Sequence, residues 1–209
     1  EYDDNDLFET TIPMNDGISH AKFYSNVKPN VVLKHFEWMA IYGITGVFHM
    51  RFMESLHNDA NREWKTTVLR NVRAAAEATG RAFAVSYNIA GKSLDDTVLD
   101  DLRADWMRLV DEESITSSHR YIRQEGMPVL RIFGIGFKSV NVRDVERMAN
   151  LIEWFQQGAE EKYRVFLVGG VPSQWRKLDG DSRSELAWEE IYNSLDGIQP
   201  WHVGRWRTI

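Results

Sequence analysis

The sequence predicts an α/β fold of the (β/α)8 TIM-barrel type, of which this chain covers five to six strands. Short apolar, β-prone segments recur every few tens of residues, and one amphipathic helical segment follows most of them. Strands that are apolar on both faces and joined by helices form a parallel sheet. No Gly-x-Gly-x-x-Gly motif follows a strand, since Gly134-Ile135-Gly136 lacks the third glycine at the right offset, so a barrel is favoured over a dinucleotide-binding sheet.

The alternation of strand and helix begins near residue 30. A first helical face carries Val32, Phe36 and Met39, and Gly43 ends this helix. Later helices carry apolar stripes through Trp64, Leu102, Val145 and Leu186. Ser93 with Asp96 and Ser182 with Glu185 resemble capping boxes, and Asn141 can cap a further helix. The predicted strands are 44–50, 82–87, 128–133, 164–168 and 198–203.

Residues 1–209 are predicted to form a single barrel domain, preceded over 1–29 by an irregular segment with at most one strand, near 21–24. A complete eight-stranded barrel needs about 250 residues. We therefore expect the domain to be truncated on its C-terminal side, and the remainder of its own barrel or a second copy to complete the sheet.

The composition argues against several classes of partner and site. The net charge is −6 and no basic run occurs, which disfavours nucleic acid. The chain has no cysteine, its six histidines are scattered, and no Gly-x-Ser-x-Gly elbow occurs. We therefore expect no metal, no cofactor and no disulfide. No apolar segment is long enough to predict a membrane span.

Candidate functional residues follow from the rule that barrel enzymes carry their sites at the carboxyl ends of the strands. Aromatic rings beside hydrogen-bond donors suit sugars, which combine apolar C–H faces with hydroxyl groups. The predicted substrate-binding residues are His49, Arg51, Tyr87, Asn88, Trp175, Arg176, Trp201 and Arg205. Phe133, Phe137, Lys92 and His202 lie at the same strand ends.

Structural interpretations of these residues remain open. His49 fits a hydrogen-bonded core histidine equally well, and the eight tryptophans of the chain also fit an aromatic core. Arg51 lies in an apolar segment and needs either a partner or a polar cavity. Asp179 and Asp181 lie in a Lys-Leu-Asp-Gly-Asp-Ser stretch that a turn and a helix cap explain adequately. Together with Glu54 they are the only acids at predicted strand ends, and none has an evident partner.

An ordered series of short motifs resembles bacterial glycoside hydrolase family 71/99-like proteins, often named xylosidase or arabinosidase. The series covers nearly the whole chain: Lys22-Phe23-Tyr24-Ser25, His35-Phe36-x-Trp38-Met39, Gly43-Ile44-x-Gly46-Val47-Phe48-x-x-Arg51-Phe52, Val168-Gly169-Gly170-Val171-Pro172-Ser173-x-Trp175-Arg176, Asp181-Ser182, Trp188, Tyr192 and Pro200-Trp201-x-Val203-Gly204-Arg205.

The resemblance implies a (β/α)8 barrel related to endo-α-mannosidases, acting on oligosaccharides or polysaccharides outside the cytoplasm, in an extracytoplasmic or secreted setting. It also implies that the catalytic glutamates lie beyond this sequence, so no catalytic residue is assigned here. Two alternatives stay open. One is a non-catalytic carbohydrate-binding or structural protein on the same barrel, and the other is a metabolic barrel acting on phosphorylated substrates.

Overall fold

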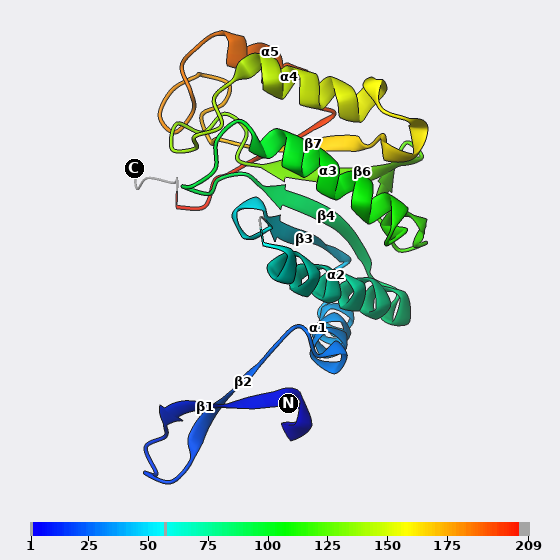
Figure 1. Ribbon diagram of the computed structural model, residues 1–209, viewed down its shortest axis with the longest axis vertical. Coiled ribbons are helices and arrows are strands. Elements are labelled where there is room, and N and C mark those ends of the chain that lie inside the picture. Colours follow the sequence, from blue (N-terminus) through cyan, green and yellow to red (C-terminus); the bar gives the residue numbers. More distant parts are fainter. Residues whose placement is uncertain (1, 57, 205–209) are drawn as a thin grey trace.

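The computed structural model describes residues 2–56 and 58–204 and contains a parallel sheet with helices between its strands (Figure 1). Each strand pairs in parallel with the next along the chain, and the short β5 pairs antiparallel with the start of β6. This is the arrangement of a partial (β/α) barrel, as the sequence predicts. The strands of this sheet, in order, are β3 (Gly46–Phe52), β4 (Ala82–Asn88), β6 (Met127–Phe133), β7 (Phe166–Val171) and β8 (Gly197–Pro200), with β5 (Arg123–Gln124) beside β6.

The helices connect successive strands. None of those in the described ranges is long and apolar enough to cross a membrane. They are α1 (Pro29–Ile41), α2 (Asp59–Thr79), α3 (Val98–Asp111), α4 (Val145–Glu153), which continues as a π-helical turn (Trp154–Gly158), and α5 (Ala187–Asn193); single 3₁₀ turns lie at Asp4–Asp6, Met53–Ser55, Ile115–Ser117 and Glu161–Tyr163.

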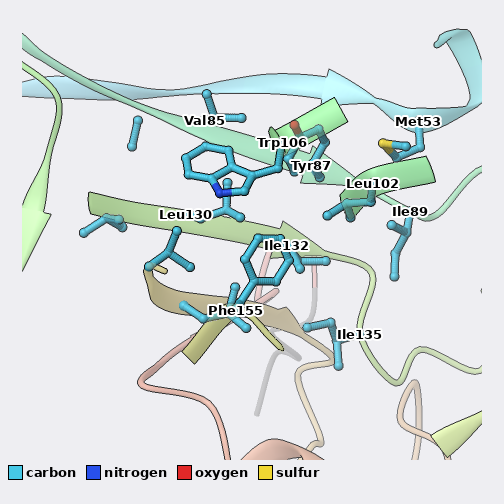
Figure 2. Close-up of a cluster of buried hydrophobic side chains, with 14 of the residues drawn as sticks. Met53, Val85, Tyr87, Ile89, Leu102, Trp106, Leu130, Ile132, Ile135 and Phe155 are labelled. Atoms are coloured by element: carbon cyan, nitrogen blue, oxygen red, sulfur yellow. The ribbon is translucent and has the colours of Figure 1, made fainter. Parts of the chain in front are cut away.

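The main core lies between the sheet and its helices. Trp106 of α3 and Phe155 of the π-helical turn are fully buried and meet edge to face, with ring centroids 6.4 Å apart. Figure 2 shows them beside buried side chains of β4 and β6, among them Val85, Leu130 and Ile132. Because side chains alternate along a strand, the neighbouring residues point to the opposite face of the sheet. We call this opposite face the inner face, since it corresponds to the interior of a closed barrel.

The N-terminal segment differs from the prediction, because it contains two strands. β1 (Leu7–Pro13) and β2 (His20–Tyr24) pair antiparallel in a hairpin that lies beyond α1 in Figure 1. The Asp16 carboxylate accepts hydrogen bonds from the Ile18 and Ser19 amides, and Gly17 adopts φ +69°. Asn15-Asp16-Gly17 is a turn signal between two β-prone stretches, and it favours this hairpin.

Three predicted helix caps are used in another way. Asp144 caps α4 and accepts from the Arg147 amide at 3.0 Å, whereas Asn141 donates its side-chain amide to the Lys92 carbonyl. Neither Ser93 nor Ser182 caps a helix. Gly80, in contrast, ends α2 in the left-handed conformation that glycine favours at this position.

Candidate functional site at the carboxyl ends of the strands

The carboxyl ends of the parallel strands meet at one edge of the sheet. Phe52 at the end of β3 is in register with Asn88 at the end of β4, and Asn88 is in register with Phe133 at the end of β6. Val171 at the end of β7 pairs with Pro200 at the end of β8. This edge, with the loops that leave it, is the rim on which the predicted site residues are expected.

Three aromatic side chains gather at the rim, and we refer to them as the aromatic cluster: Phe133, Phe137 and Trp201. The Phe133 ring lies 5.4 Å from Phe137 and 5.3 Å from Trp201, measured between centroids. Phe137 is buried, Phe133 is partly buried, and Trp201 is 40% exposed. The Trp201 amide donates to the Val171 carbonyl at 2.9 Å, which fixes the chain just past β8. The cluster therefore presents Trp201 to solvent on a packed support.

Two glycines make this packing possible. A Cβ atom on Gly170 would lie 2.8 Å from Cδ2 of Phe133, so the ring lies directly on the backbone of β7. Gly136 adopts φ +73°, and a Cβ there would lie 2.1 Å from the hydroxyl oxygen of Tyr192. That hydroxyl donates to the Gly136 carbonyl at 3.2 Å. The loop after β6 thus depends on glycine both for its conformation and for its contact with α5.

Two of the acids near the rim tie neighbouring loops together. Glu54, after β3, accepts from the amide and the hydroxyl of Ser93 at 3.1 and 2.6 Å. Asp96, before α3, accepts from the backbone amides of Arg143 and Asp144 at 2.6 and 2.9 Å. Both carboxylates therefore join one strand-helix loop to the next.

Two further acids, Asp179 and Asp181, organise the loop after β7. Asp181 accepts from the amide and hydroxyl of Ser173 at 3.1 and 2.9 Å, and from the Gln174 amide at 3.2 Å. Asp179 accepts from the Gly180 amide at 2.6 Å. These contacts support the turn interpretation of the two aspartates.

Arg51 and Tyr87 lie on the helix face of the sheet, where both are fully buried against α3. Nε and Nη2 of Arg51 each donate to the Asp105 carboxylate at 2.9 Å, and the Tyr87 hydroxyl donates to the same carboxylate at 2.7 Å. Burial and the Asp105 carboxylate raise the pKa of Tyr87. This geometry assigns the two residues to the core, away from any rim ligand.

His49 shares the helix face of β3 with Arg51 by strand alternation. Its Nε2 atom is buried without a hydrogen-bond partner among the described residues. Burial, with contributions from the positive charges of Arg51 and Lys65, lowers the pKa of His49 to about 4. The ring is therefore neutral near pH 7 and belongs to the packed structure.

The remaining predicted site residues lie at or after the strand ends. Asn88 ends β4, and its side-chain oxygen accepts from the Ala90 amide at 2.8 Å. Trp175 is partly buried against Tyr192, and the exposed Arg176 guanidinium lies 5.0 Å from the Trp175 ring centroid. Arg205 lies outside the described residues. Two of the predicted residues in the described ranges therefore lie next to Phe133: Asn88 is its partner on the neighbouring strand, and Trp201 contacts its ring.

Arg131 is not among the predicted site residues, although it lies on the inner face of β6 and is only 5% exposed. The signal that could have identified it is a charged residue inside an apolar run, here Val129-Leu130-Arg131-Ile132-Phe133. The same signal identified Arg51.

The described residues contain no group of three His, Asp or Glu side chains that could hold a metal ion.

Comparison with known proteins supports the fold. No family model and no curated protein matches this chain. Two solved structures of a GH99 endo-α-mannosidase from Bacteroides thetaiotaomicron do match. The first has a TM-score of 0.57 at 16% identity over 84% of this chain. The second, in complex with bis-tris-propane, has a TM-score of 0.56 at 14% identity over 84%.

The match covers 44% and 47% of the two mannosidase chains, so this chain spans less than half their length. At such low identity the likeness concerns the fold. The chain has a GH99-like domain fold, which agrees with the resemblance carried by its motifs.

Proposed function

We propose that this chain forms part of a glycoside hydrolase-type barrel that binds an oligosaccharide or polysaccharide at the rim, outside the cytoplasm. The observation that carries the proposal is the aromatic cluster, in which an exposed Trp201 stands on Phe133 at the carboxyl end of the sheet. The GH99-like fold and the names of the matched structures support the choice of a glycan as the ligand.

The chemistry of the rim suits a sugar ring. The face of an indole packs against the apolar C–H face of a pyranose, while polar groups at the edge take the hydroxyls. Asn88 supplies an amide at the adjacent strand end, and the exposed Gln199 supplies another on β8. We place the bound sugar over Trp201, with its hydroxyls toward these amides.

Hydrolysis of a glycosidic bond generally requires two carboxyl groups on either side of the scissile bond. Glu54 and Asp181 hold rim loops through several hydrogen bonds each, which does not suit an acid that must reach the substrate. In our proposal the catalytic pair therefore does not come from Glu54 and Asp181. The match covers 44% of the first mannosidase chain, so more than half of that chain has no counterpart in this sequence.

The same observation favours a second candidate, a carbohydrate-binding or structural protein without turnover. Such a protein would use the aromatic cluster and the amides and would need no acid pair. Release of reducing ends from a glycan panel by the natural full-length protein separates the two candidates. Binding without release favours the second candidate.

The binding proposal is tested by replacing Trp201 with alanine. We expect Trp201→Ala to weaken binding of a glycan from the panel about tenfold or more, or ~1.4 kcal/mol, because the stacking surface is removed. Isothermal titration calorimetry gives the affinity and thermal unfolding gives Tm. Trp64→Ala is the matched control, since Trp64 is 46% exposed but lies on α2. Equal affinity of both variants, or no binding of any glycan by the wild-type protein, contradicts the proposal.

A further inference from the structure

Three arginines are buried in the described part of the chain: Arg51, Arg131 and Arg183. Arg51 is paired with Asp105, and Arg183 donates through Nη2 to the Val140 carbonyl. Arg131 makes one hydrogen bond, from Nη1 to the Ser86 hydroxyl at 3.1 Å. No carboxylate among the described residues pairs with it, which is unusual because a buried charge is costly without a partner.

The environment of Arg131 is aromatic. Its guanidinium lies 5.0 Å from the Phe133 ring and 6.0 Å from the Phe48 ring, measured to the centroids. A Cβ on Gly170 would lie 3.0 Å from Nη2, so the glycine leaves space beside this nitrogen. Burial also lowers the pKa of Arg131 from its ordinary value. The two rings hold the guanidinium in place but accept no hydrogen bond from Nε or Nη2.

The unused side of Arg131 is the edge formed by Nε and Nη2. In this protein the same edge takes a carboxylate twice. Arg51 presents it to Asp105 at 2.9 Å for both nitrogens, and Arg70 presents it to Glu113 at 2.7 Å for both. This geometry matches the two oxygens of a carboxylate.

Arg131 lies directly beneath the aromatic cluster. It is two residues before Phe133 on the same strand, so both side chains share the inner face, and Phe133 contacts Trp201 at 5.3 Å. On the neighbouring β3, Phe48 and Phe52 are 38% and 49% exposed, which leaves the inner face open on that side. The Phe133 ring thus lies between Trp201 and the guanidinium, whose Nε is buried without a partner among the described residues. A ligand that extends from Trp201 past Phe133 onto the inner face would therefore meet a cationic group.

We infer that Arg131 binds the carboxylate of an acidic saccharide, so that the rim selects glycans containing uronic acid over neutral ones. The inference rests on the proposed function and adds the charge of the substrate to it. In the bound state Nε and Nη2 donate to the two carboxylate oxygens, Nη1 keeps the Ser86 hydroxyl, and the sugar ring stacks on Trp201.

The experiment compares fragments of polygalacturonate, alginate and glucuronoxylan, each beside its methyl-esterified, uncharged form. Binding to the natural full-length protein is measured by calorimetry at pH 7. We expect at least one acidic fragment to bind tenfold or more tightly than its ester. Arg131→Met should abolish this difference in affinity without weakening binding of the ester. Arg131→Lys should lose most of the difference, because lysine cannot donate two parallel hydrogen bonds to a carboxylate.

Arg103→Met is the matched control. Arg103 likewise lies over an aromatic ring, 5.1 Å from the Trp154 centroid, but it belongs to α3, and its substitution should leave the preference intact. Equal binding of acid and ester by the wild-type protein, or an unchanged preference in Arg131→Met, overturns the inference and leaves the proposed function standing. A lowered Tm of Arg131→Met without any change in selectivity also overturns it, because Arg131 then acts only in the stability of the fold. If no saccharide of this panel or of the neutral panel binds, the proposed function itself fails.

Discussion

Arg51 and Arg131 lie on opposite faces of one sheet, and their surroundings lead to different consequences. Arg51 is locked to Asp105, which also receives the Tyr87 hydroxyl and Arg108. Removing one charge of such a buried network lowers the free energy of unfolding far more than replacing the whole pair with apolar residues. Among the residues that the structure describes, no carboxylate pairs with Arg131, so its removal is expected to be much less damaging to stability.

Asp105→Ala should destabilise the fold by about 3–5 kcal/mol, because it leaves the Arg51 guanidinium buried and unpaired. The double variant Arg51→Met with Asp105→Leu should recover much of this loss. Asp100→Ala on the same helix is the control, since Asp100 pairs with Arg147 at an exposed site and should cost less than about 1 kcal/mol. Urea unfolding measures all three. If Asp105→Ala lowers the free energy of unfolding no more than the control does, the network contributes little to stability.

His49 makes stability depend on pH. Its pKa of about 4 in the folded protein lies below the ordinary value of 6.5, so the unfolded chain binds the additional proton. The contribution of neutral His49 is therefore complete above pH 6.5 and is lost as the pH falls from 6.5 towards 4. The full loss is about 3 kcal/mol.

We expect His49→Gln to remove this dependence. The difference in unfolding free energy between wild-type protein and variant, measured in urea at pH 7, 6, 5 and 4, should shrink as the pH falls. His20→Gln is the control because His20 is exposed on the hairpin. If the difference stays constant from pH 7 to 4, His49 is solvated in the folded protein.

At the scale of elements, loops determine how the strand-helix units fit together. Lys138 donates its amide to the Asp181 carbonyl, and Arg183 donates its amide to the Gly136 carbonyl, so the loops after β6 and β7 pair with each other. Tyr192 of α5 reaches into this pairing through its hydroxyl. The aromatic cluster therefore depends on backbone geometry as well as on its own side chains.

Gly136→Ala should show this dependence. The alanine would have to adopt φ +73°, and its Cβ would overlap the Tyr192 hydroxyl. We therefore expect the free energy of unfolding to fall by clearly more than the ~1–2 kcal/mol that the left-handed conformation alone costs. Gly126→Ala is the matched control, with φ +82° and no atom within 4 Å of the new Cβ. Thermal and urea unfolding compare the two. Equal losses would mean that α5 moves aside at little cost.

The alternation of helix and strand was predictable because apolar periodicity reports burial directly, and the predicted strands 82–87 and 128–133 coincide closely with β4 and β6. Side-chain direction at the strand ends was not. One residue of register separates Arg51 on the helix face from Phe52 on the inner face, and no pattern distinguishes a buried ion pair from a ligand contact.

The capping predictions failed for a related reason. Ser93 and Ser182 have the right neighbours for a cap, but in this fold Ser93 reaches Glu54 and Ser182 reaches Tyr192. These partners lie 39 and 10 residues away, so a local motif could not reveal them. The aromatic cluster likewise joins Phe133 to Trp201, which lies 68 residues later in the sequence.

For the whole molecule, the order of strands in the sheet follows their order along the chain, apart from the short β5. Each of these strands after β3 therefore pairs with a strand that precedes it in the sequence and leaves the ribosome first. Contacts between neighbours in sequence also favour rapid folding. The architecture that gathers the strand ends into one rim thus allows the sheet to grow one strand at a time during translation.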